Sequence, residues 1–163
     1  MSTDRPNPIR DTDDDARQMA QDFLTNSRHA ALGVMLADQQ PLVTRVAFGR
    51  DLDGQALTLI SGLAAHTQAL KTNPRCSLLL GEPGAKGDPL SHPRLSLMAE
   101  AEFLDRNGDD HAARAAHYLT QQPKAKLYLG LGDFTFVRLK VTGAALNGGF
   151  GRAYTLEPAD MGL

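Results

Sequence analysis

One short stretch of the chain combines side chains that can hold a phosphate group. Ser61 and Thr67 carry hydroxyls that can donate to phosphate oxygens, and His66 can add a proton and a positive charge. Ser61 ends an apolar run typical of a strand, and His66 and Thr67 fall in the first turn of the helix expected next, where backbone N–H groups attract anions. Arg45 lies within another apolar run and needs an anion nearby. These four residues predict a site for a phosphorylated ligand.

The same residues also allow a purely structural interpretation. Ser61 and Thr67 have side chains that commonly cap helices, and Arg45 can lie at the rim of a sheet. The residue types alone leave both interpretations open.

Motifs for several other chemistries are missing from the sequence. The glycines before Lys86 lack the spacing of a P-loop, and Thr135 stands where a dinucleotide motif that starts at Gly130 needs its third glycine. Ser61 lacks the first glycine of a nucleophile elbow. The histidines form no H-E-x-x-H motif, and Cys76 is the only cysteine. We therefore expect no metal site, and the sequence identifies no catalytic residue.

Length and composition indicate one globular domain of 163 residues. The net charge of −2 argues against a nucleic-acid partner, which would require a basic face. No apolar run reaches the length of a membrane helix, and the polar start lacks the apolar core of a signal peptide, so we expect a cytoplasmic protein with no membrane partner. Residues 1–11 are expected to form a flexible arm, and residues 12–163 the single domain.

The hydrophobic pattern predicts a mainly β (α+β) protein. A helix is expected from Thr12, with an acid three residues later to complete its cap, and another after Asn107. A short helix should end before Asn73, because Pro74 follows it. Strands are expected over residues 30–36, 42–49, 56–61, 75–80, 94–104, 134–139 and 141–146. Short strands joined by tight turns favour an antiparallel barrel with helices packed outside.

Several segments, in this order, carry a family resemblance: Pro41 to Arg45, Leu59 to Thr67, Asn73 to Leu79, Gly87 to Leu90, Arg94 to Leu97, Asp133-Phe134, Arg138-Leu139 and Gly148 to Ala153. Together they resemble the pyridoxamine 5′-phosphate oxidase-related FMN-binding split-barrel proteins, most closely the branch of haem-utilisation proteins. The resemblance covers about residues 15 to 157.

The resemblance implies a six-stranded antiparallel split β-barrel with flanking helices, and a homodimer with two FMN sites at the subunit interface. By resemblance, Ser61, His66 and Thr67 would hold the phosphate. The residues expected to lie along or approach the flavin are Thr44, Arg45, Val46, Arg94 and Leu95.

The sequence departs from the family pattern in ways that affect function. His66 and Thr67 replace an Arg-Lys pair, so phosphate binding should be weaker and more pH-dependent, and Gly62 stands where the family often has Asn. Residues 151–163 contain Arg152 but no His to match the oxidases' substrate-binding pair. We therefore do not expect pyridoxamine 5′-phosphate oxidase activity. The chain stops at Leu163, so a haem ligand from a C-terminal tail of the family type is not expected either.

Three functional hypotheses follow. The first is an FMN-dependent oxidoreductase that acts on an unidentified small molecule. The second is a haem-binding or haem-degrading barrel without flavin. The third is a non-enzymatic, dimeric ligand-binding module.

Overall fold

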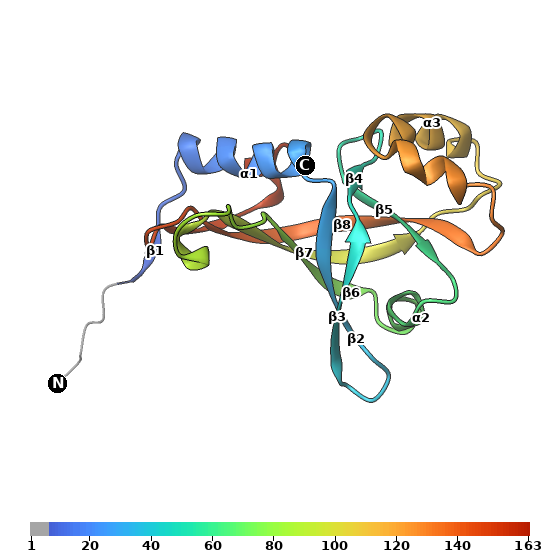
Figure 1. Ribbon diagram of the computed structural model, residues 1–163, viewed down its shortest axis with the longest axis horizontal. Helices are drawn as coiled ribbons and strands as arrows, with labels where there is room; N and C mark the ends of the chain where they lie inside the picture. Colours follow the sequence, from blue (N-terminus) through green and yellow to red (C-terminus); the bar gives the residue numbers. More distant parts are fainter. Residues whose placement is uncertain (1–6) are drawn as a thin grey trace.

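The computed structural model describes residues 7–163. Within them, the α-helices are α1 (Asp14–Asn26), α2 (Ala65–Thr72) and α3 (His111–Gln121), and three short 3-10 helices are η1 (Pro89–Ser91), η2 (Pro123–Leu127) and η3 (Pro158–Met161) (Figure 1). The strands are β1 (Ile9–Arg10), β2 (His29–Met35), β3 (Pro41–Ala47), β4 (Gly49–Arg50), β5 (Ala56–Ser61), β6 (Arg75–Leu80), β7 (Arg94–Phe103), β8 (Phe134–Asn147) and β9 (Ala153–Leu156).

The strands close into a barrel through a corner between β3 and β4. Antiparallel pairing runs from β3 through β2, β6, β7 and β8 to β5. β5 also pairs with β4, which follows β3 after the single residue Phe48. The buried Thr58 on β5 fastens this corner, because its hydroxyl donates to the carbonyl oxygen of Ala47 at 2.7 Å. With β3 and β4 counted as one bent strand, the ring has the six strands of the predicted split barrel.

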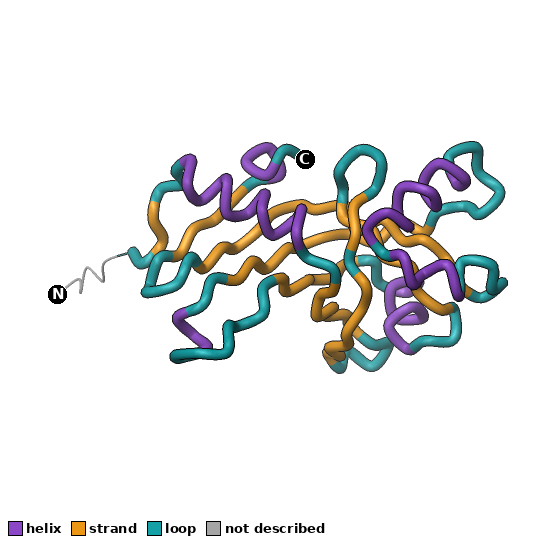
Figure 2. Tube along the Cα trace, turned by 45° about the horizontal axis from the view of Figure 1, so that its top comes forward, coloured by secondary structure: helices purple, strands orange, loops and turns teal. Residues whose placement is uncertain are grey.

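Strand alternation divides the barrel wall into an inner and an outer face. On β6, Cys76, Leu78 and Leu80 are buried, while Ser77 and Leu79 are exposed. The inward side chains form one apolar core with the buried face of α1, which lies along the strands in Figure 2. A second apolar cluster forms where α3 and η2 cover the outer face of β5 and the start of β8. Burial of these side chains drives the closure of the barrel.

Part of the outer face is covered by none of the three α-helices. Strand register places Val43, Gly33, Ser77 and Met98 side by side across β3, β2, β6 and β7. Val43 is 68% exposed and Met98 is 40% exposed. In Figure 1 this face lies on the side of β7 away from α1, next to the β2–β3 hairpin that projects from the sheet. We call it the uncovered face.

The two long helices begin later than the sequence pattern predicts. Asp13, rather than Thr12, caps α1 by accepting a hydrogen bond from the backbone N–H of Ala16 at 2.8 Å. The hydroxyl of Thr12 instead donates to the carbonyl oxygen of Thr155 at 2.8 Å. α3 begins at His111 after Asp110, because a turn occupies the residues that follow Asn107.

The two strands predicted over 134–146 form the single strand β8. Its register against β7 shifts where Met98 faces Gly143 and Ala99 faces Val141, which leaves Thr142 as the extra residue of a bulge. The arm predicted over residues 1–11 lies partly outside the described residues. Within it, Ile9 and Arg10 form β1, which pairs in parallel with β9.

Candidate functional site

The hydroxyls of Ser61 and Thr67 are both engaged by the protein. Ser61 Oγ donates to Asp133 Oδ2 at 2.6 Å and accepts from the backbone N–H of Leu63 at 3.1 Å. Thr67 is buried, and its hydroxyl donates to the carbonyl oxygen of Ser61 at 2.6 Å. Neither side chain caps α2, whose N-cap residue is Ala64. Both hydroxyls therefore stabilise the corner between β5 and α2. The Asp133 carboxylate lies beside the Ser61 hydroxyl, where the sequence predicts the phosphate of a ligand.

His66 is held from the barrel wall by one ring nitrogen. Its Nδ1 lies 3.0 Å from Oγ1 of Thr44 on the inner face of β3. Its Nε2 is buried and has no hydrogen-bond partner within residues 7–163. Burial lowers the pKa of His66 below its ordinary value of 6.5, because the charged imidazolium loses hydration. The ring is therefore mostly neutral at pH 7 and does not supply the positive charge expected from the sequence.

Arg45 does not join this group of residues. It follows Thr44 directly on β3, so its side chain lies on the opposite, outer face of the barrel wall, where it is exposed. Within residues 7–163 it forms no ion pair. Val46 returns to the inner face and is buried in the core. Strand alternation thus separates Arg45 from His66 within one chain.

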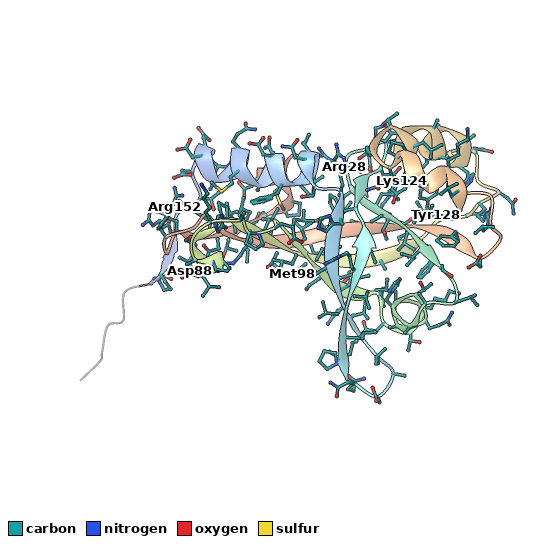
Figure 3. The ribbon with its side chains drawn as sticks, viewed as in Figure 1. Arg28, Asp88, Met98, Lys124, Tyr128 and Arg152 are labelled. Carbon is teal, nitrogen blue, oxygen red and sulfur yellow. The ribbon has the colours of Figure 1, made fainter. Side chains whose placement is uncertain are left out.

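Arg94 and Leu95 lie at the other end of the sheet. Arg94 Nη1 donates to the carbonyl oxygens of Leu90 and His92, at 2.9 and 3.2 Å. Leu90 and His92 belong to the loop that follows Asp88. Asp88 is labelled in Figure 3 and lies far from α2, which is labelled in Figure 1. Leu95 is fully buried in the core. The structure therefore brings together Thr44, Ser61, His66 and Thr67, and places Arg94 and Leu95 elsewhere.

The uncovered face carries a groove that the sequence did not reveal. Its volume is about 660 Å³, and residues from β2, β3, β6, β7 and β8 line it. Most of the lining is apolar. Its lining includes Gly33, Met35, Val43, Arg75, Met98 and Thr142.

Gly33 and the bulge residue Thr142 line the groove, and Gly143 lies next to this bulge. A Cβ on Gly33 would find only the Ser77 carbonyl oxygen, at 3.8 Å, so the space above this glycine is open. Gly143 faces Met98 across the β7–β8 pair, next to the bulge at Thr142. An isolated glycine in a strand often marks a bulge or a close approach by a ligand. The glycines were thus the available signal, but the strand register that joins them was not readable from the sequence.

The charged and thiol groups of the groove have distinct states. Arg75 is exposed and forms no ion pair within residues 7–163. Burial and the charge of Glu100 raise the pKa of Cys76 to about 11, so this thiol is protonated at neutral pH. Its Sγ lies 3.7 Å from the carbonyl oxygen of Ala99. In the described part of the chain, no group of three or more His, Cys, Asp or Glu side chains is arranged to hold a metal ion.

No helix within residues 7–163 is long and apolar enough to cross a membrane.

Comparison with known proteins gives consistent matches. The sequence profile of the family described as pyridoxamine 5′-phosphate oxidase matches residues 16–147. The chloroplastic protein of Arabidopsis thaliana named non-canonical heme oxygenase HOZ is 34% identical over 100 residues, which are 61% of this chain and 29% of that protein. This chain therefore matches less than a third of the plant protein's length.

Two solved structures are also similar. A heme binding protein from Mycobacterium smegmatis is 26% identical, with a TM-score of 0.80 over 97% of this chain and 61% of the other. Atu2129 from Agrobacterium tumefaciens, a protein of unknown function, is 36% identical, with a TM-score of 0.76 over 90% of this chain and 60% of the other.

Proposed function

Because the chain belongs to the pyridoxamine 5′-phosphate oxidase family, we propose that its barrel binds a planar redox cofactor, and that this cofactor is haem. The observation that carries the proposal is the groove on the uncovered face. Its volume of about 660 Å³ falls within the range of roughly 300–1,000 Å³ typical of cofactor pockets. The names of the plant and mycobacterial relatives, which both refer to haem, support the same choice.

The groove offers haem an apolar slot with a cation at its border. The porphyrin would contact Val43 and fill the open space above Gly33. Arg75, which forms no ion pair within residues 7–163, would bind a propionate carboxylate. Haem, when bound, supplies iron-centred redox chemistry, while the protein supplies orientation and electrostatics. The plant relative is named a heme oxygenase, and haem breakdown by this chain would use the same groove.

FMN is the second candidate cofactor, and one specific observation favours it. α2 begins without a side-chain cap, and the backbone N–H groups of Ala65 and His66 have no partner within residues 7–163. Such a helix start attracts phosphate. However, the site lacks a fixed cation, and the hydroxyl of Ser61 already donates its hydrogen bond to the carboxylate of Asp133. We therefore rank FMN, and with it a flavin-dependent oxidoreductase, below haem.

A homodimer would complete the haem site. The uncovered face continues from the groove toward Leu79 and Ile9, which are 44% and 48% exposed. A second copy would cover this apolar area and limit access of water to the groove. Light scattering should give the mass of two chains, and Leu79→Glu should shift it toward one.

The proposed function is tested by titrating the purified protein with hemin and, separately, with FMN. We expect a Soret band with saturable hemin binding. Gly33→Leu should weaken hemin binding by about tenfold or more, because hydrophobic pockets discriminate single methylenes by roughly 10–200-fold. Leu63→Ala, which changes an exposed side chain outside the groove, is the control. Wild-type protein that gives no Soret band would refute the haem proposal, and saturable FMN binding in its place would favour the second candidate.

A saturable Soret complex without any change in the haem over time would support binding alone. That result would place the protein with the non-enzymatic modules of the third hypothesis. Loss of the Soret band with time under reducing conditions would indicate haem breakdown.

A further inference from the structure

We propose that the thioether sulfur of Met98 is the protein ligand of the haem iron. This inference rests on the proposed function, because it requires haem in the groove. Met98 lies near the middle of β7, where the β2–β3 hairpin leaves the sheet (Figure 3). Its side chain is 40% exposed and lines the groove. Methionine is an established axial ligand of haem iron in proteins.

The backbone around Met98 is held while its side chain stays free. Thr142, the extra residue of the β8 bulge, donates from Oγ1 to the carbonyl oxygen of Met98 at 3.3 Å. Gly143 faces Met98 in the register, and a Cβ there would lie 3.4 Å from the Met98 Cε. A side chain at position 143 would therefore crowd the methyl group of Met98. Bulges commonly re-aim side chains next to functional sites, and this one lies beside Met98.

No histidine takes the place of Met98. The chain has His29, His66, His92, His111 and His117, and none of them lines the groove. His29 Nε2 lies 2.9 Å from Oε1 of Glu82, and both ring nitrogens of His92 are hydrogen-bonded within its own loop. His66 is engaged by Thr44 on the inner side of the barrel, and its Nε2 is buried.

Two other sulfur atoms line the groove, in Cys76 and Met35, and each is a poorer candidate for the iron ligand than Met98. The Cys76 thiol is protonated and buried, and thiolate rather than thiol is the metal ligand. A thioether needs no deprotonation and can bind iron at neutral pH. Met35 also lines the groove, but it lies opposite Pro41 at the end of the β2–β3 hairpin. Met98 lines the groove between Ser77 and Gly143 in the strand register, where a porphyrin would face it.

The test compares hemin complexes of the wild type, Met98→Leu, Met98→His and the matched control Met35→Leu. Leucine conserves the volume and apolar character of methionine, so the barrel should stay folded, as far-UV circular dichroism would verify. Met98→Leu should bind hemin roughly tenfold or more weakly, since even outer-shell changes cost about 10–100-fold in metal affinity. It should also lose the long-wavelength sulfur-to-iron charge-transfer band of the ferric complex.

The reduction potential provides an independent readout. Methionine ligation raises the potential of haem iron, so Met98→Leu should lower it. Met98→His should restore hemin affinity without the sulfur band, and Met35→Leu should match the wild type. A wild-type Soret band whose spectrum and potential are unchanged in Met98→Leu would overturn the ligand assignment while leaving haem binding intact. Loss of the sulfur band in Met35→Leu alone would overturn it as well, whereas the absence of any Soret band refutes the proposed function itself.

Discussion

Oγ1 of Thr44 lies 3.0 Å from Nδ1 of His66, and this contact joins the inner face of β3 to the first turn of α2. Thr44 thus orients the imidazole, while Nε2 lies buried without a partner within residues 7–163. Protonation of His66 would place a positive charge inside the protein, which is unfavourable. The stability of the fold should therefore depend on pH through this residue.

The expected direction follows from the lowered pKa of His66. Below the ordinary value of 6.5, the unfolded chain binds a proton that the folded chain does not, so folding stability falls as pH falls. The loss ends once pH drops below the folded-state pKa, where both states are protonated. Urea unfolding between pH 7.5 and 5 should show this loss in the wild type and a smaller loss in His66→Gln. Parallel curves for the two proteins would contradict the prediction.

A buried ion cluster should make Asp51 critical for stability. Asp51 is fully buried at its side chain, and its two carboxylate oxygens accept from Arg114 Nε at 2.9 Å and Arg138 Nη2 at 2.7 Å. Asp51→Ala should lower the free energy of unfolding by about 3–5 kcal/mol, because it leaves the buried guanidinium of Arg114 without an ion pair. The control is Asp53→Ala, which removes an exposed carboxylate 3.5 Å from Arg138. Equal losses in urea unfolding would show that burial of the cluster does not matter.

Much of the barrel could be predicted because its signals are local. The bounds of β5 and β6 agree with the apolar runs 56–61 and 75–80, which turn residues and Pro74 delimit. The short helix after Ser61 was also predicted, and the structure places His66 and Thr67 in its first turn.

The candidate site was predicted less well because it depends on side-chain direction and strand register. Thr44 and Arg45 are consecutive strand residues and point to opposite faces, so they could not serve one site within a single chain. The groove joins Gly33, Ser77 and Met98 through pairings between strands distant in sequence. No local pattern in one sequence specifies that register.

The turn at Gly149 should tolerate no side chain. Gly149 has a φ of +84°, and a Cβ there would lie too close to the carbonyl oxygen of Ser91. Gly87 has the same φ of +84°, but a Cβ there would find no atom within 4 Å. Each alanine variant should pay the left-handed backbone cost of roughly 1–2 kcal/mol. Gly149→Ala should lose about 1–3 kcal/mol more from overpacking, and equal melting temperatures would exclude the contact with Ser91 as a cause.

The carboxylate of Asp133 should weaken any phosphate binding at the start of α2. It accepts the hydroxyl hydrogen of Ser61 at 2.6 Å and would repel a phosphate placed beside that hydroxyl. Asp133→Asn should therefore tighten FMN binding by up to about fivefold, since a pair of exposed charges is worth roughly 0.2–1 kcal/mol. Asp22→Asn, an equal change of charge on the exposed side of α1, should have no effect. Flavin fluorescence quenching measures both affinities, and an unchanged affinity in Asp133→Asn would show that the phosphate of FMN does not bind next to Ser61.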